Sequence, residues 1–218
     1  EAMINDLING KSKYSNVFNY PAFTWADVAV IGWLVDGAAI VNQVANSKGS
    51  YGPYVRALER ICYEESFHLK QGHDNVVFLA TGTEMQRTML QEALNRWWQP
   101  LMHFFGPSDT MSVHTEKLMR WKVKMASNDD MRQQFISMYV PKIWELGLTL
   151  PDNELKRNPL TGKWAFADPD WNLFFEVIKG NGPLNKERLA VRRTAEERGR
   201  WVREALLKAD MKYTVPFA

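Results

Sequence analysis

Apolar residues recur every three to four positions along most of this chain, which is the spacing of a helix with one buried face. Two of the predicted helices are long and lie next to each other in sequence, one from Trp25 to about Asn46 and one from Pro53 to about Ala80. Thr24 is a typical N-cap for the first, because Asp27 follows three residues later as in a capping box. The segment Lys48-Gly49-Ser50 should break the helix before the second one begins.

The same spacing predicts helices along nearly all the rest of the chain. Residues 148–169 are the exception: they read as irregular, with a small hairpin turning at Pro159-Leu160-Thr161-Gly162, so that an irregular or hairpin insertion is expected near 150–168. The expected fold class is therefore all-α, in a single domain that covers residues 1–218. The further helices are predicted at 1–9, from a cap at Thr83 to a loop at Gly106, and at 112–126, 129–146, 170–179 and 184–210.

Composition narrows the class of protein but not its activity. The hydrophobic content of 45% allows a sizeable core, and a net charge of +2 gives no reason to expect a nucleic-acid partner. A single cysteine, Cys62, excludes an internal disulfide framework and fits the cytoplasm. The apolar stretch from Val28 to Ala45 contains Asp36 and is short for a bilayer span, so a core helix is expected there and no membrane partner.

Candidate chemistry lies on the two long helices. Glu65 and His68 are three residues apart, so they share one helix face and can bind one metal ion together. Glu65 falls on the apolar stripe of its helix, with His68 on the flank, so both should point toward a core. Asp36 is surrounded by apolar residues on the preceding helix. Because an unpaired buried carboxylate is costly, a metal ion held by Asp36, Glu65 and His68 would relieve that cost, and these ligand types suit iron or manganese.

Simpler interpretations of the same residues stay open at this point. A Glu-x-x-His pair is often only a hydrogen bond, and Asp36 could cap or ion-pair with a neighbouring helix. Carboxylate-bridged di-iron proteins use two Glu-x-x-His pairs with a further Glu from each of two helices. The sequence contains a single such pair, at Glu65 and His68, so it would supply half of a site of that kind.

Longer strings in the chain resemble a known family, the catalytic A subunits of bacterial phenylacetyl-CoA epoxidases, over essentially the whole sequence. These strings are long and specific, so they are stronger evidence than the single Glu-x-x-His pair. The resemblance rests on Tyr14-Ser15, Phe18-Asn19-Tyr20-Pro21, Trp25-Ala26-Asp27, the run from Ile31 to Gln43, Tyr51-Gly52-Pro53-Tyr54, Glu64-Glu65-Ser66-Phe67-His68, Asn95-Arg96 with Trp98, Phe105-Gly106-Pro107 and Trp201-Val202-Arg203-Glu204-Ala205.

The resemblance implies a ferritin-like helical bundle and a place among the multicomponent monooxygenases. It implies ring 1,2-epoxidation of phenylacetyl-CoA with O2 at a di-iron centre, in the cytoplasmic degradation of phenylacetate. Electrons would come from NADPH through a separate reductase subunit that carries FAD and a 2Fe-2S cluster. The expected protein partners are a small B subunit together with a related, non-catalytic C subunit. The alternative is a non-catalytic, metal-poor scaffold subunit of the same kind of complex. The family strings disfavour a third possibility, a plain helical metal-storage or structural protein.

Residue by residue, the resemblance makes Asp36, Glu65 and His68 the second half of the family's metal site. The first half, and about the first third of the family's subunit, would lie upstream of Glu1. Phe18, Asn19 and Asn42 are then expected to contact the substrate or its thioester.

Overall fold

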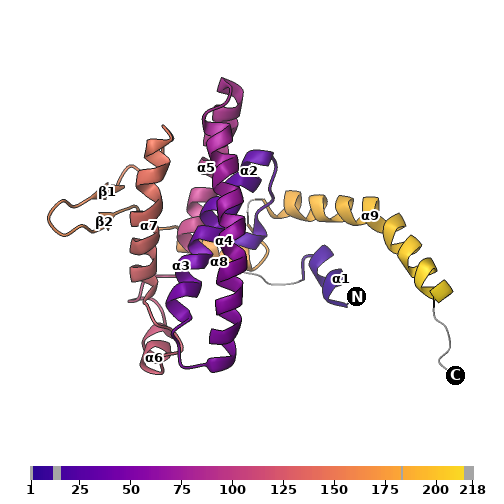
Figure 1. Ribbon diagram of the computed structural model, residues 1–218, viewed down its shortest axis with the longest axis horizontal. Coiled ribbons are helices and arrows are strands. Elements are labelled where there is room, and N and C mark those ends of the chain that lie inside the picture. Colours follow the sequence, from indigo (N-terminus) through magenta and orange to yellow (C-terminus); the bar gives the residue numbers. More distant parts are fainter. Residues whose placement is uncertain (1, 12–15, 183, 214–218) are drawn as a thin grey trace. The chain divides into compact units, whose positions relative to one another are not determined.

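The computed structural model describes residues 2–11, 16–182 and 184–213, with the backbone alone described at 16, 18 and 210–213 (Figure 1). The chain forms two compact units. The larger comprises residues 22–174, and the smaller comprises residues 1–21 together with 175–218. Whether these units make up the single domain that the sequence predicts stays a prediction.

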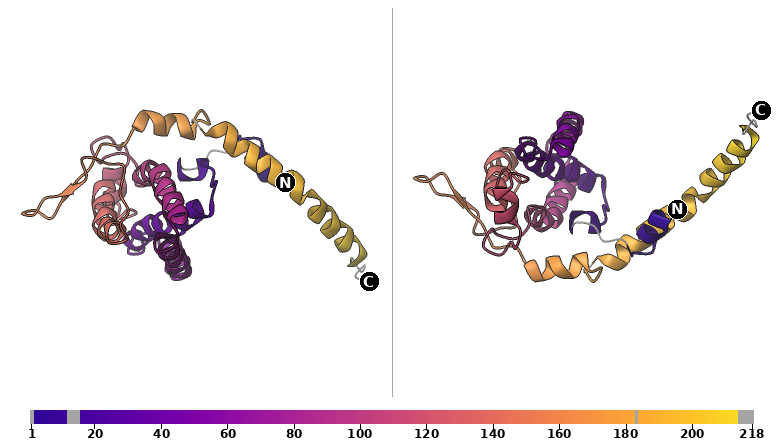
Figure 2. Two further views of the ribbon diagram at one scale, coloured as in Figure 1. Left: turned by 90° about the horizontal axis from the view of Figure 1, so that it is seen from above. Right: turned by 90° about the horizontal axis from the view of Figure 1, so that it is seen from below.

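The larger unit is built from long helices whose axes run in similar directions, as Figure 2 shows by viewing several of them nearly end-on. The predicted all-α class is confirmed by this architecture. In chain order the elements are α2 (Trp25–Val30), the π-helix η2 (Ile31–Val35), α3 (Asp36–Asn46), α4 (Gly52–Ala80), α5 (Glu84–Phe104), α6 (Thr115–Arg120), α7 (Asn128–Glu145), the strands β1 (Lys156–Arg157) and β2 (Trp164–Ala165), and α8 (Trp171–Ile178), which continues into the smaller unit.

The predicted helix that ends at Asn46 is confirmed, and Thr24 caps it. The Thr24 hydroxyl accepts from the backbone N–H of Asp27, and the Asp27 carboxylate accepts from the backbone N–H of Thr24, which completes a capping box. The π-turn η2 was not predicted: it inserts a wider turn between α2 and α3, directly before Asp36. Such turns re-aim the side chains that follow them.

The helix predicted over 112–126 is wrong, since α6 stops at Arg120. Two hydrogen bonds from Ser50 explain the early end. The Ser50 hydroxyl donates to the carbonyl of Trp121 at 2.7 Å, and its backbone N–H donates to the carbonyl of Lys122 at 2.7 Å. Lys122 has a φ of 55°, which a right-handed helix cannot contain. A contact from a distant part of the chain therefore replaces the next helical turn.

The core of the larger unit lies where α2, η2 and α3 pack between α4, α5 and α7. The run Trp25–Asn46 is long and apolar enough to cross a membrane by length and composition. Several of its apolar side chains are buried against neighbouring helices, as expected for the core helix that the sequence predicts. Among the fully buried side chains are Leu34 from η2, Leu58 from α4, Leu94 from α5 and Phe135 from α7.

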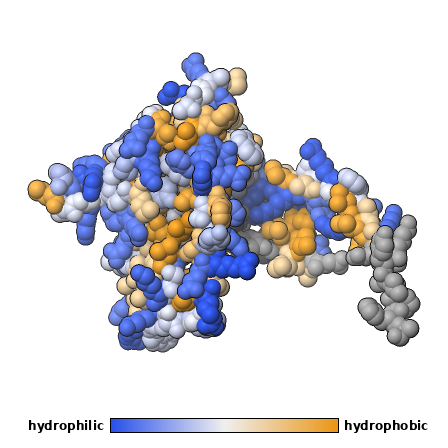
Figure 3. Space-filling view, in the orientation of Figure 1, coloured by the Kyte–Doolittle hydropathy of each residue, from blue (hydrophilic) through white to orange (hydrophobic). Residues whose placement is uncertain are grey.

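The apolar stripe predicted for α4 is buried in only part of the helix. Of the stripe residues, Leu58, Val76 and Leu79 are buried, but Ile61 is 37% exposed. Phe67, which was not part of the predicted stripe, is 57% exposed. Figure 3 shows apolar residues reaching the surface of the larger unit over α3 and the adjoining part of α4. The middle of α4, which carries the candidate ligands, is therefore not enclosed by the described residues.

The predicted hairpin is confirmed as a two-stranded antiparallel pair in which Arg157 faces Trp164.

The smaller unit contains α1 (Ala2–Ile8), the 3-10 helix η1 (Asn16–Asn19) and the long α9 (Asn185–Tyr213). Gly10 follows the end of α1 with a φ of 72°, and the Leu189 side chain of α9 lies against it. A residue with a Cβ would be strained at this φ and its Cβ would be too close to Leu189, so glycine suits both the turn and the contact.

Candidate metal centre

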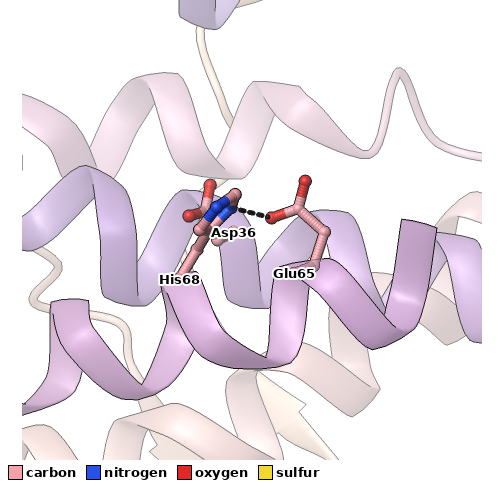
Figure 4. Close-up of side chains that lie close together, drawn as sticks. All are labelled: Asp36, Glu65 and His68. Atoms are coloured by element: carbon pink, nitrogen blue, oxygen red, sulfur yellow. Dashed lines mark hydrogen bonds and ion pairs between the residues drawn. The ribbon is translucent and has the colours of Figure 1, made fainter. Parts of the chain in front are cut away.

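Asp36, Glu65 and His68, predicted as one ligand set, are brought together by the fold. Asp36 is the first residue of α3, whereas Glu65 and His68 lie one turn apart on α4 (Figure 4). Each offers one potential ligand atom, and these three atoms all lie within 4.8 Å of one another. Side chains from two consecutive helices, about 30 residues apart along the chain, thus converge on a space small enough for one cation.

The Glu65 and His68 side chains meet directly. The Nδ1 atom of His68 lies 3.4 Å from Oε2 of Glu65, the contact drawn as a dashed line in Figure 4. The Glu65 side chain is 24% exposed and the His68 side chain is 63% exposed. The expectation that both point into a core is therefore wrong for His68, because the helix face that carries it is not covered by the described residues.

The Asp36 carboxylate is in the most unusual electrostatic environment of the three. Burial raises its pKa to about 6, and the nearby negative charge of Glu65 adds to the rise, whereas His68 acts in the opposite direction. Within the described part of the chain, the Asp36 carboxylate accepts no hydrogen bond and forms no ion pair with Lys or Arg. The simpler interpretation of Asp36 as a helix cap or salt-bridge partner is therefore not supported by these contacts.

The three side chains fit a metal ion by the chemistry of their donor atoms. Two carboxylates and an imidazole are typical ligands of iron and manganese in oxygen-activating proteins. Two carboxylates this close repel each other unless a proton or a cation lies between them, and the raised pKa of Asp36 expresses that repulsion together with burial. The 3.4 Å contact between Glu65 and His68 is long for a hydrogen bond, so it does not account for the cluster alone.

Tyr139, which lies beside the cluster, is a residue that the helical pattern did not single out. It is 2% exposed on α7, stacks on Phe135 with ring centroids 4.8 Å apart and meets the edge of Trp33 at 5.9 Å. Burial and the negative charge of Asp36 raise its pKa to about 12, so its hydroxyl stays protonated at neutral pH. A Cβ at Gly37 would overlap the Tyr139 ring, so the glycine after Asp36 was the one signal in the sequence for this close approach.

A cavity of about 240 Å³ lies between α4 and α7, next to the cluster. Its walls are the rings of Trp33 and Tyr139, and two lysines and a histidine reach its rim. It begins within one helical turn of His68 on α4. The lining residues are Trp33, Ser66, Leu69, Lys70, His73, Tyr139 and Lys142.

The three predicted substrate-contact residues are divided between the two units of the chain. Asn42 is half-buried on α3, where its Oδ1 accepts from the side-chain amide of Asn46 at 2.6 Å. Asn46 in turn accepts from the backbone N–H of Met125 at 3.3 Å, so this pair also ties α3 to the segment after α6. Asn19 is buried in the smaller unit, and the side chain of Phe18 lies outside the described residues. The substrate-binding roles of all three stay predictions.

Comparison with known proteins places this chain beside enzymes of aromatic degradation. Residues 1–201 match a family described as phenylacetic acid catabolic protein. Over 212 residues the chain is 49% identical to the A subunit of 1,2-phenylacetyl-CoA epoxidase from Escherichia coli (strain K12). The aligned part covers 97% of this chain and 69% of that relative.

Proposed function

This chain belongs to the phenylacetic acid catabolic protein family, and we propose that it is the catalytic subunit of a multicomponent di-iron monooxygenase. The proposed reaction is epoxidation of the aromatic ring of phenylacetyl-CoA with O2 and electrons from NADPH. The observation that carries the proposal is the convergence of Asp36, Glu65 and His68, whose ligand atoms lie within 4.8 Å of one another. A protein that only served as a scaffold would have no need of this cluster, so the alternative of a metal-poor scaffold is not favoured.

Iron, when bound, would supply the redox chemistry that activates O2. Asp36 and Glu65 would hold it as carboxylates, and a cation between them would favour their charged forms. His68 would bind through a neutral imidazole nitrogen. These three side chains amount to one half of the ligand set of a di-iron centre, so the second iron depends on further carboxylate and histidine ligands.

The surroundings of the cluster have separate roles in this proposal. The rings of Trp33 and Tyr139, both almost fully buried, place apolar surface beside the cluster and form two walls of the adjacent cavity. The Tyr139 hydroxyl holds its proton at neutral pH, so it remains a hydrogen-bond donor beside the site. By its position near Asp36 on α3, Asn42 is the residue that we assign to the substrate thioester. The contacts expected from Phe18 and Asn19 stay predictions.

The partners in this proposal are those of a multicomponent oxygenase. A separate reductase subunit with FAD and a 2Fe-2S cluster would deliver electrons from NADPH, and a small B subunit with a related C subunit would complete the complex. The exposed His68 and the exposed apolar residues around the middle of α4 are consistent with assembly into a larger complex. We place the complex in the cytoplasm, where NADPH and CoA thioesters are available.

The test is reconstitution of the protein with its partner subunits and reductase, followed by iron analysis and product analysis. We expect bound iron, O2 consumption that depends on phenylacetyl-CoA, and one oxygen atom from isotopically labelled O2 in the epoxide. Glu65→Ala should lose iron and lower turnover on the order of 100-fold or more, because a ligand is removed.

The neighbouring residue gives a matched control. Glu64 is exposed and pairs with Arg60 at 2.9 Å, so Glu64→Ala removes the same charge one position away from the cluster. It should retain iron and turnover. Full iron content in Glu65→Ala, or a product without oxygen from O2, would contradict the proposed function.

A further inference from the structure

The helices that carry the candidate ligands touch each other through two glycines. Gly32 lies in the π-turn η2, four residues before Asp36, and Gly72 lies in α4, four residues after His68. A Cβ built on Gly32 would be 3.3 Å from the Cα of Gly72. At this point the two backbones are in direct contact, with no side chain between them.

The two glycines are not equally constrained. A Cβ on Gly72 would overlap the carbonyl carbon and oxygen of Gly32 and the backbone nitrogen of Trp33. These are backbone atoms of a buried helix, so they cannot rotate away as a side chain would. To bring such a Cβ to an ordinary contact distance, the helices would have to separate by more than about 1 Å. On Gly32 the corresponding contact is too short by only a few tenths of an ångström.

The contact lies close to the metal ligands on both helices. Asp36 is about one helical turn from Gly32, and His68 is about one turn from Gly72, each a distance of roughly 6 Å along its helix. Because a helix is stiff over one turn, any separation at the glycines carries over to the gap between Asp36 and the pair Glu65–His68. The ligand atoms lie within 4.8 Å of one another at present, so roughly 1 Å more is a large change for a metal site.

We propose that Gly72 is a positioning residue for the metal centre: its missing side chain lets α4 approach η2 closely enough for Asp36 to share a cation with Glu65 and His68. This inference rests on the proposed function insofar as it assumes that the cluster binds a metal. It does not depend on which substrate is oxidised or which partner supplies electrons.

Helix propensity opposes these glycines, which supports a spatial reason for them. Glycine inside a helix costs about 1 kcal/mol relative to alanine. Gly72 is buried in the interior of the 29-residue helix α4, where neither a turn nor a positive φ requires glycine. Gly199 in α9 has open space around the position of its Cβ, so it provides a glycine in a long helix without any close contact.

The experiment measures Co²⁺ binding by the full protein, with the visible absorption of bound Co²⁺ as the readout and Co²⁺ standing in for Fe²⁺. We expect Gly72→Ala to weaken Co²⁺ binding at least 10-fold, as loss of a supporting contact at a metal site does. Gly199→Ala should leave the affinity unchanged. Parent affinity in a folded Gly72→Ala protein would overturn the inference.

A second substitution separates positioning from general damage to the fold. Asp36→Glu lengthens the carboxylate by one methylene, about 1.5 Å. In the parent it should weaken Co²⁺ binding, because the longer side chain no longer fits the short gap. In the Gly72→Ala background it should strengthen binding at least threefold, because it spans the wider gap. Equal weakening by Asp36→Glu in both backgrounds would overturn the proposal, since destabilisation alone predicts no reversal of sign.

Two further measurements test the role of Gly72: Co²⁺ binding by a Gly32→Ala variant, and the distance between the ligand atoms in a crystal structure. If Gly72→Ala does not fold, Gly32→Ala replaces it, with an expected two- to threefold loss of Co²⁺ affinity because the helices separate by only a few tenths of an ångström. Unchanged affinity would overturn the inference. A crystal structure of the metal-free variant should show the ligand atoms of Asp36 and His68 further apart than in the parent. If the parent binds no Co²⁺, the metal site of the proposed function fails, while the spacing in that crystal structure still decides whether Gly72 sets the gap.

Discussion

Asp27 and Asp36 are two aspartates on one apolar helical run, nine residues apart, and their carboxylates lie in opposite electrostatic environments. The Asp27 side chain is fully buried. Its Oδ2 accepts from the backbone N–H groups of Phe23 and Thr24, and its Oδ1 accepts from the side chains of Arg96 and Trp97. Although burial opposes ionisation, these donors outweigh it and hold the pKa of Asp27 below its usual range.

Asp36 is only half-buried, yet its pKa is raised to about 6. Among the described residues no donor forms a hydrogen bond to its carboxylate. The negative charge of Glu65 adds to the effect of burial, whereas His68 acts in the opposite direction. The difference shows that burial alone does not mark a functional carboxylate. A carboxylate whose acceptors are all occupied by the protein's own donors holds the fold together, whereas one that faces another carboxylate without donors is suited to bind a cation.

Replacing each aspartate by asparagine tests this contrast. The replacement at Asp27 should have the largest effect on the free energy of unfolding. Asp27→Asn removes the charge that Arg96 and the Trp97 N–H rely on and places an amide N–H among donors. We expect a loss of about 3 kcal/mol in the free energy of unfolding, because one partner of a buried pair is left uncompensated. Urea denaturation of the metal-free protein measures it. A loss below about 1 kcal/mol would mean that water solvates the Arg96 guanidinium, which is 32% exposed, when the Asp27 charge is absent.

His103 on α5 provides a second comparison with Asp27, because it is a buried ionisable group whose charged form is disfavoured. It is 1% exposed and lies against Trp171 and Phe174, and burial lowers its pKa to about 4, although Asp170 acts in the opposite direction. The unfolded chain, with a histidine pKa near 6.5, takes up the proton first, so stability is fully present above about pH 6.5 and is lost as the pH falls toward 4.

The expected loss from His103 over that pH range is about 3 kcal/mol in the free energy of unfolding. Urea denaturation at several pH values measures it, with His103→Gln as the comparison. The variant should be less stable at pH 7 but should lose much less stability on acidification. Parallel pH profiles for the two proteins would show that His103 becomes protonated without leaving the core.

Asp36→Asn should have the smallest effect and the opposite sign. In metal-free protein, kept so with a chelator, it removes the repulsion between Asp36 and Glu65 and should raise the free energy of unfolding by about 1 kcal/mol. Iron or Co²⁺ should then stabilise the parent but not the variant. If Asp36→Asn destabilised the metal-free protein as Asp27→Asn does, the two aspartates would play the same structural role.

Local signals in the sequence were sufficient for most helices and for one side of the site. Thr24 and Thr83 cap helices where the sequence predicts, because an N-cap acts within three residues of itself. Glu65 and His68 share a helix face for the same local reason. The helix predicted over 112–126 was wrong because Ser50, about 70 residues away, captures the carbonyls that would have continued it.

The sequence by itself determined that this protein is helical, that Glu65 and His68 form a pair, and that Asp36 lies in an apolar helix. Only the tertiary structure decided that Asp36 faces that pair while Asp27 does not. The reason is that the outcome depends on the π-turn before Asp36 and on the contact of Gly32 with Gly72, which set the distance between two helices. Periodicity describes one helix at a time and contains no information about how closely two helices approach.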